Sequence, residues 1–149
     1  MSRDEHPRLD EKPVVILYDG VCGLCHRSVR FLLERDREGA FRFASLSSPV
    51  AREVLGRHGI NAGPPDTFYA VVDFGLATER VLSRSSGVLH ALGRLPGWRR
   101  LAAAMAYLPQ RIRDFAYDLV ARHRYRIFGR YDTCPLPEAR YRDRFIDVP

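Results

Sequence analysis

Two short apolar segments near the N-terminus enclose a helical pattern. Residues 14–18, Val-Val-Ile-Leu-Tyr, form a continuous apolar run rich in β-branched side chains, which is typical of a strand buried in a parallel sheet. From Cys22 the apolar positions fall on one stripe with arginines between them, which predicts a helix that Gly39 ends. The alternating segment 41–44 predicts a second strand. A strand, a helix and a strand within about 30 residues predict a βαβ unit with parallel strands.

A second helix and a hairpin follow this unit. Ser48 suits the N-cap of a helix and Pro49 suits its first turn. Phe74 and Gly75 form a turn signal between two strand patterns, which predicts a β-hairpin. The predicted elements are a helix from 49 to about 58–59, a loop at 61–66 and strands at 67–73 and 77–82.

The C-terminal half has helical patterns. Ser85 or Ser86 is expected to cap a helix that reaches about Leu92, and two further helices are predicted at 98–107 and 110–127. One face of the last helix carries mostly apolar side chains, namely Ile112, Phe115, Ala116, Leu119, Val120 and His123.

The order of these elements predicts an α/β fold. A β-α-β-α-β-β-α core followed by two additional helices is the thioredoxin-like arrangement of a βαβ half and a ββα half. The 149 residues correspond to a single domain, with a disordered tail at 1–12 and a C-terminal helical extension at 97–128. A chain of this length buries about two-thirds of its unfolded surface, so it needs neither a disulfide framework nor a structural metal to fold.

Composition narrows the class of protein. Apolar residues make up 46% and charged residues 28%, which excludes a disordered or low-complexity protein. Three cysteines do not suit a disulfide-stapled secreted domain, and the N-terminal residues form no apolar signal segment. We therefore expect a cytoplasmic protein.

The chain is basic, with a net charge of +6, and Lys12 is the only lysine among its 24 Lys and Arg residues. Such a skew indicates genome composition rather than function. Arginines of the last helix, with Tyr117 and Tyr125, could form a nucleic-acid or lipid surface, but a charge run of this kind is usually a solvated face. We therefore expect neither nucleic-acid binding nor membrane-surface contact from Arg111, Arg113, Arg122, Arg124 and Arg126.

The sharpest chemical feature is Cys22-Gly23-Leu24-Cys25, where the first strand passes into the first helix. Cysteines three apart on a helical turn face the same side, within the Cα separation of about 4.4–6.8 Å that a disulfide needs. The helix N-terminus favours the thiolate of Cys22. Cys25, one turn further in, is expected to be more buried. Cys22 is therefore predicted to attack and Cys25 to resolve the mixed disulfide.

Neighbouring residues are expected to shape this site. His26, when protonated, and Arg27 would add positive field. Gly23 would leave room for a substrate to approach Cys22, and Leu24 would form part of an apolar lip. The sequence therefore predicts Gly23 and Leu24 as substrate-binding residues.

Asp19 lies three residues before the first cysteine and has two interpretations. It would accept a proton from Cys25 if burial raised its pKa. Otherwise it turns the chain or caps the helix.

The segment 18–25 resembles the DCC family of thiol-disulfide oxidoreductases, a DUF393-type group named for its Asp-x-x-Cys-x-x-Cys signature. The resemblance covers about 14–145 and implies a thioredoxin-like fold, a dithiol-disulfide function and roles for Asp19, Cys22 and Cys25. It implies no cofactor beyond the redox-active disulfide, with a thiol or disulfide substrate and an external reductant or oxidant as partners. The further matching segments are 30–32, 43–44, 124–130 and Cys134.

Two rival sites use the same cysteines. Cys22-x-x-Cys25-His26 matches the c-type haem attachment pattern, which requires export. A zinc site could combine both cysteines with Cys134 and with His26 or His123, although a second Cys-x-x-Cys is missing. The alternative function is thus a binding module on the same scaffold, which holds a metal or docks a partner through its basic helices.

Two further residues keep open roles. Cys134 is either an exposed tail thiol or a third redox cysteine. Pro65 precedes the third predicted strand, where thioredoxin-like folds often have a cis-proline opposite the active site, so it is a candidate substrate contact. The plain alternative is a trans Pro-Pro loop.

Overall fold

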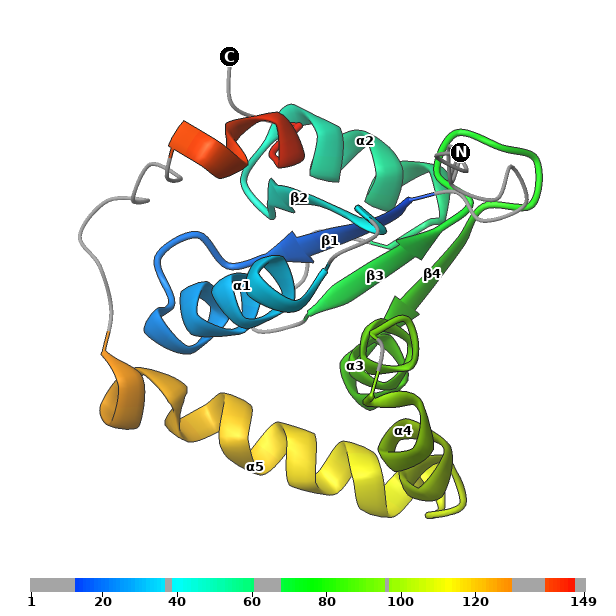
Figure 1. The fold of residues 1–149 in the computed structure, drawn as a ribbon, viewed down its shortest axis with the longest axis vertical. Helices are drawn as coiled ribbons and strands as arrows, with labels where there is room; N and C mark the ends of the chain where they lie inside the picture. Colours follow the sequence, from blue (N-terminus) through cyan, green and yellow to red (C-terminus); the bar gives the residue numbers. More distant parts are fainter. Residues whose placement is uncertain (1–12, 37–38, 61–67, 96, 130–138, 147–149) are drawn as a thin grey trace, which may run out of the picture.

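The computed structural model describes residues 13–36, 39–60, 68–95, 97–129 and 139–146, and the predicted tail and the 61–66 loop lie outside these ranges. It has the predicted order β-α-β-α-β-β-α followed by two helices, a thioredoxin-like α/β fold (Figure 1). The elements are β1 (Val14–Tyr18), α1 (Gly23–Arg35), β2 (Phe41–Ser45), α2 (Pro49–Arg57), β3 (Tyr69–Val72), β4 (Arg80–Ser83), α3 (Arg84–Gly93), α4 (Arg99–Ala106), α5 (Gln110–Phe128) and the 3₁₀ helix η1 (Ala139–Arg144).

The sheet has the order β2-β1-β3-β4, in which β1 pairs parallel with β2 and antiparallel with β3. The predicted βαβ unit is therefore confirmed. All five residues of β1 are buried, because helices cover both faces of the sheet. Ile16 packs in the core with α1 and α3, whereas Leu17 packs in the core with α2. This burial on both faces explains the continuous apolar run in the sequence.

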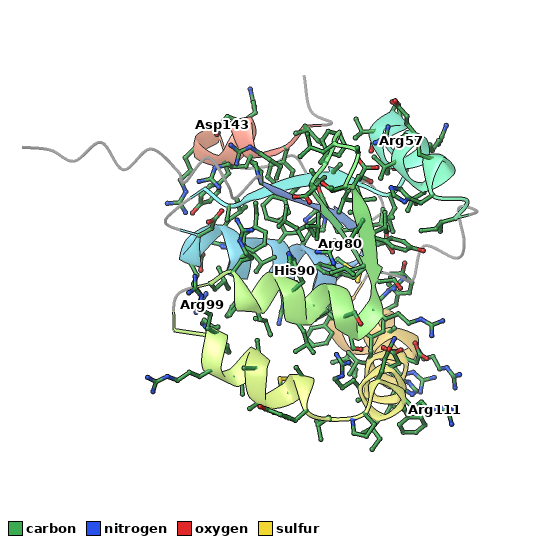
Figure 2. The ribbon with its side chains drawn as sticks, turned by 90° about the vertical axis from the view of Figure 1, so that its right-hand side faces the viewer. Arg57, Arg80, His90, Arg99, Arg111 and Asp143 are labelled. Carbon is green, nitrogen blue, oxygen red and sulfur yellow. The ribbon has the colours of Figure 1, made fainter. Side chains whose placement is uncertain are left out.

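Helices α4 and α5 form an outer layer. Helix α4 contacts α3, and α5 contacts both α1 and α3. Figure 2 shows α3 between the sheet and this layer. No helix within the described ranges has the length and apolar character that a membrane span requires. The apolar face predicted for α5 is largely exposed, with Phe115 at 71% and Leu119 at 50%.

Helix α1 ends at Arg35, four residues before the predicted stop at Gly39. The buried carboxylate of Asp36 accepts hydrogen bonds from the backbone N–H groups of residues 40–41, at 2.8 and 3.0 Å. Arg144 also contacts this carboxylate, at 2.8 Å. Asp36 therefore turns the chain into β2, and Gly39 serves the same turn with a φ of +69°.

Helix caps were predicted correctly once and wrongly once. Ser48 caps α2, because its hydroxyl accepts a hydrogen bond from the first turn of that helix. Neither Ser85 nor Ser86 caps α3, whose N-cap residue is Ser83. The Ser85 hydroxyl instead donates to Asp114 of α5, so a contact between helices replaces the expected cap.

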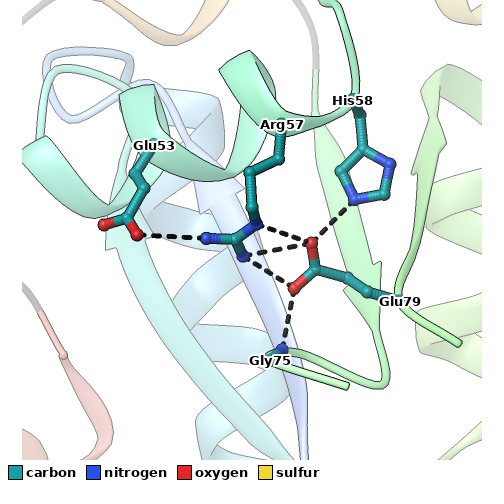
Figure 3. Close-up of polar contacts among 5 residues, drawn as sticks. All are labelled: Glu53, Arg57, His58, Gly75 and Glu79. Atoms are coloured by element: carbon teal, nitrogen blue, oxygen red, sulfur yellow. Dashed lines mark hydrogen bonds and ion pairs between the residues drawn. The ribbon is translucent and has the colours of Figure 1, made fainter. Parts of the chain in front are cut away.

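Strand β4 begins at Arg80 rather than at 77, because Glu79 closes a longer connection. Its carboxylate accepts hydrogen bonds from the Gly75 backbone at 2.8 Å, from Arg57 Nη2 at 2.8 and 3.1 Å, and from Arg57 Nε at 3.3 Å. The His58 ring nitrogen lies 2.7 Å from the same group. Figure 3 shows this cluster, which fastens the β3–β4 connection to the end of α2.

The contacts of Glu79 lead us to expect that the protein loses stability in acid. Burial disfavours its charge, but the hydrogen bonds from Gly75, Arg57 and His58 outweigh burial and lower its pKa to about 2. This contribution is complete above the ordinary glutamate pKa and disappears as pH falls from about 4.5 towards 2. Glu79→Gln should cost about 1.5–3 kcal/mol of unfolding free energy at pH 7. Denaturant titrations should converge for the two proteins near pH 2, and parallel curves would contradict the assignment.

Candidate active site

The two cysteines lie where β1 passes into α1. Cys22 occupies the N-cap of α1, with extended backbone angles, and its sulfur accepts a hydrogen bond from the Cys25 backbone N–H at 3.4 Å. Both thiols are free in the structure. The predicted placement of a Cys-x-x-Cys pair at a helix N-terminus is therefore confirmed.

The two thiols have opposite acidities. A hydrogen bond with the Cys25 side chain is the largest of the influences that lower the pKa of Cys22 to about 6, against the opposing effect of burial. Backbone hydrogen bonds and the charge of Arg124 act in the same lowering direction. The same hydrogen bond, together with burial and the Cys22 charge, raises the pKa of Cys25. These influences favour a thiolate at Cys22 and a thiol at Cys25.

The predicted exposure of the two sulfurs is wrong. Cys22 is fully buried, at 0% exposure, whereas Cys25 is half-buried. The backbone that follows α5 packs against this helix end, where the Gly23 N–H donates to the Gly129 carbonyl at 3.2 Å. A Cβ on Gly23 would come within 2.2 Å of the Phe128 carbonyl oxygen. Gly23 therefore makes room for the chain itself, not for an approaching substrate.

Asp19 is buried and links β1 to the end of α5. One carboxylate oxygen accepts a hydrogen bond from the Val21 N–H at 3.1 Å, which is the turn-forming role. The other contacts the Arg124 guanidinium at 3.2 Å and accepts a hydrogen bond from the Tyr125 hydroxyl. Arg124 is itself only 3% exposed, so this is a buried ion pair. The carboxylate therefore tethers the C-terminal motif to the cysteine loop.

Arg124 was not predicted as a site residue and was wrongly assigned to a solvated face. Tyr117 is a second exception to that face, since its hydroxyl oxygen accepts a hydrogen bond from the Phe68 N–H at 2.8 Å. Three other arginines of the helix are exposed as predicted, namely Arg111, Arg122 and Arg126. The signal in the sequence that could have identified Arg124 was the 124–130 motif of the family resemblance.

His26 and Arg27, which were expected to add positive field to the site, contact neighbouring parts of the chain. The His26 ring nitrogen contacts the Gly20 carbonyl oxygen, which ties the ring to the loop before the cysteines. The Arg27 guanidinium lies over the Phe128 ring, 5.5 Å from its centroid. The guanidinium that lowers the cysteine pKa is that of Arg124.

A cavity of about 680 Å³ lies beside the cysteine pair, between α1, α3, α4 and α5. Cys25 lines it together with Asp19 and Arg124, and Leu24 contributes as the predicted apolar lip. Its size is that of a small-molecule site. The remaining lining is mainly apolar and includes Phe31, Phe68, Val88, Leu92, Met105 and Val120.

Two predicted site residues, Pro65 and Cys134, lie outside the described residues. The zinc hypothesis depends on Cys134 and so stays a prediction. Across the described ranges, no group of three or more His, Cys, Asp or Glu side chains is arranged to hold a metal ion.

The fold and the cysteine pair together define a thioredoxin-like dithiol protein. Residues 16–130 match the DCC1-like thiol-disulfide oxidoreductase family, and the chain belongs to this family, as the resemblance implied. It is 32% identical over 132 residues to the uncharacterized protein YuxK of Bacillus subtilis, covering 89% of this chain and 93% of YuxK. It is 34% identical over 128 residues to a chloroplastic DCC family protein of Arabidopsis thaliana, covering 85% and 72% of the two chains. No solved structure matches the chain significantly.

Proposed function

We propose that this protein catalyses thiol-disulfide exchange by cycling Cys22 and Cys25 between dithiol and disulfide. The observation that carries the proposal is the position of Cys22 at the N-cap of α1, where its sulfur accepts a hydrogen bond from the Cys25 N–H at 3.4 Å. This arrangement lowers the pKa of Cys22 and raises that of Cys25. A low pKa supplies the attacking thiolate at neutral pH, and a raised pKa keeps the second sulfur protonated until it is needed.

The reaction has two steps. The Cys22 thiolate attacks one sulfur of a substrate disulfide, and the other substrate sulfur leaves as a thiolate. Cys25 then loses its proton and attacks the Cys22 sulfur, which releases the second substrate thiol and forms the protein disulfide. Two electrons pass to the substrate, and an external dithiol restores the protein; an external oxidant drives the reverse direction.

Asp19 and Arg124 support these steps in different ways. The Arg124 charge favours the Cys22 thiolate. Asp19 lines the same cavity as Cys25 and is our candidate acceptor for the Cys25 proton. The apolar lining favours a substrate that carries an apolar group beside its reactive sulfur.

A redox titration tests the proposal. The protein would be equilibrated across a graded thiol/disulfide buffer, and intact mass with peptide mapping would report the Cys22–Cys25 state. We expect a reversible two-electron midpoint between about −270 and −120 mV, the range of related dithiol proteins. A pair that never bridges, or that carries metal or haem mass, would overturn the proposal in favour of a binding module.

The acidity of Cys22 predicts a pH profile for alkylation. Because the thiolate is the reactive form, iodoacetamide labelling of Cys22 should rise through a midpoint near pH 6. Cys25 should stay unlabelled well above neutral pH, since its pKa is raised. Peptide mapping of the labelled protein separates the two sites. A Cys22 midpoint above pH 8 would contradict the assignment.

Gly23→Ala should displace the Phe128–Gly129 backbone from the start of α1. The added Cβ would clash with the Phe128 carbonyl oxygen, so the segment must move, at a cost of about 1–3 kcal/mol in unfolding free energy. Cys22 should then alkylate several-fold faster at saturating pH. Gly56→Ala is the matched control, because nothing lies within 4 Å of its Cβ position in α2. Equal alkylation rates in all three proteins would argue against shielding by this segment.

A further inference from the structure

Helix α5 divides its apolar side chains between the cavity and the solvent, so that some line the cavity and others are exposed on the outside of the protein. Ile112, Phe115 and Leu119 follow one another at helical spacing and are 56%, 71% and 50% exposed. The opposite face makes polar contacts with the rest of the chain. Its contacts run from Asp114 to Ser85, from Tyr117 to Phe68 and from Arg124 to Asp19. A surface helix ordinarily has the reverse orientation, so this stripe requires a partner outside the fold.

The charges around this stripe are of one sign. Arg111, Arg122 and Arg126 are exposed on the same helix. Figure 2 shows Arg111 in the part of the molecule farthest from the sheet. The two acidic residues of α5 are paired with α3, because Asp114 binds Ser85 and the partly exposed Asp118 lies 3.8 Å from an Arg84 nitrogen. We name these three arginines, with Ile112, Phe115 and Leu119, the outer face of α5.

Helix α4 adds further basic residues to this side of the protein. Its sequence contains no acidic residue, and Arg99 and Arg100 are exposed at its start. Tyr107, just after the helix, is 91% exposed. The α4–α5 layer thus combines apolar and aromatic side chains with arginines, and its two acidic groups, Asp114 and Asp118, are paired with α3.

We propose that the outer face of α5 docks the protein on an anionic lipid surface. A bilayer interface can bind both the apolar side chains and the arginines. The apolar side chains enter the boundary between headgroups and acyl chains, while the arginines remain at the level of the phosphates. Nucleic acid would match the arginines but give Ile112 and Leu119 no apolar partner. A second copy of the chain would bring the same arginines together across a two-fold interface. Complementarity of charge and of apolar surface therefore favours the lipid.

The docked orientation would bring the cavity to the lipid. Ile112 belongs both to the outer face and to the lining of the cavity that contains Cys25. Met105 and Leu108 also line the cavity and are 36% and 48% exposed. The apolar edge of the cavity and the docking surface are thus continuous. The docking proposal itself does not depend on the redox function.

Vesicle co-sedimentation of the full chain tests the proposal. We expect binding to phosphatidylcholine vesicles that contain phosphatidylglycerol, little binding to phosphatidylcholine alone, and a decline with salt. Phe115→Gln/Leu119→Gln should weaken binding at least about tenfold. Arg111→Gln/Arg122→Gln should weaken it about fivefold or more, and only on the anionic vesicles.

Matched controls lie elsewhere on the surface. Phe74→Gln and Arg52→Gln remove an exposed apolar and an exposed basic residue outside the α4–α5 layer, and both should bind vesicles as the parent protein does. Circular dichroism should show all four variants folded. Absence of sedimentation with the anionic vesicles would overturn the proposal. So would a concentration-dependent dimer abolished by Phe115→Gln, or RNA binding that needs the same arginines while vesicles are ignored.

Discussion

Cys22→Ser is expected to abolish disulfide exchange, by at least about a thousandfold, because a serine hydroxyl supplies no anionic nucleophile at neutral pH. The substitution changes one atom, and the hydroxyl can still accept the hydrogen bond that caps α1, so the fold should remain intact. The rate of reduction of a small aromatic disulfide, measured at several pH values, reports the effect. The parent rate should rise through pH 6 with the thiolate.

Cys25→Ser is the paired variant. It should still attack the substrate but stop at the mixed disulfide, because no second sulfur can displace it. Intact mass should then show one substrate thiol bound at Cys22. The roles would be reversed if Cys22→Ser trapped the substrate at Cys25 instead, an outcome to be looked for because Cys25 is the sulfur that lines the cavity.

Arg124→Met should have the second largest effect among these substitutions. It should lower the free energy of unfolding and also change the reactivity of Cys22. The substitution leaves the Asp19 carboxylate buried without its cation, which costs about 3–5 kcal/mol of unfolding free energy. The Cys22 pKa should move upward from about 6, because the guanidinium charge helps to lower it. Chemical denaturation and the pH profile of Cys22 alkylation measure the two consequences separately.

A double variant separates the ion pair from the redox chemistry. Asp19→Asn/Arg124→Met removes both charges, so it should recover much of the lost stability while the Cys22 pKa stays raised. Arg122→Met is the control on the exposed side of the same helix and should change stability by less than about 0.5 kcal/mol. An Arg124→Met protein as stable as the control, with its alkylation midpoint still near pH 6, would remove Arg124 from the site.

The features predicted correctly from the sequence depend on neighbours along the chain. The buried run at 14–18 predicts a central strand, Ser48 and Pro49 predict the start of α2, and the position of Cys22 predicts the helix N-cap. In each case the residues that decide the structure lie within a few positions of one another. Local rules of capping and periodicity therefore suffice there.

The features that were missed depend on partners far along the chain. Arg124 looks like any other arginine of a basic helix until Asp19, 105 residues earlier, is placed beside it. Ser85 fails as a cap because Asp114, 29 residues away, takes its hydroxyl. The sequence predicts an apolar face on α5, and the polar contacts of Asp114, Tyr117 and Arg124 hold another side of this helix against the fold, which leaves Phe115 and Leu119 exposed. Periodicity identifies an amphipathic helix but does not determine which face meets the fold.

The long separation between Asp19 and Arg124 also sets an order of events during synthesis. The cysteine loop is synthesised about 5–20 s before Arg124, at about 5–20 residues per second. Until α5 docks, Cys22 lacks the guanidinium that favours its thiolate and the Phe128–Gly129 backbone packed against the start of its helix. The nascent chain thus carries cysteines of more ordinary reactivity, and the redox centre matures only when the last long helix closes on the first.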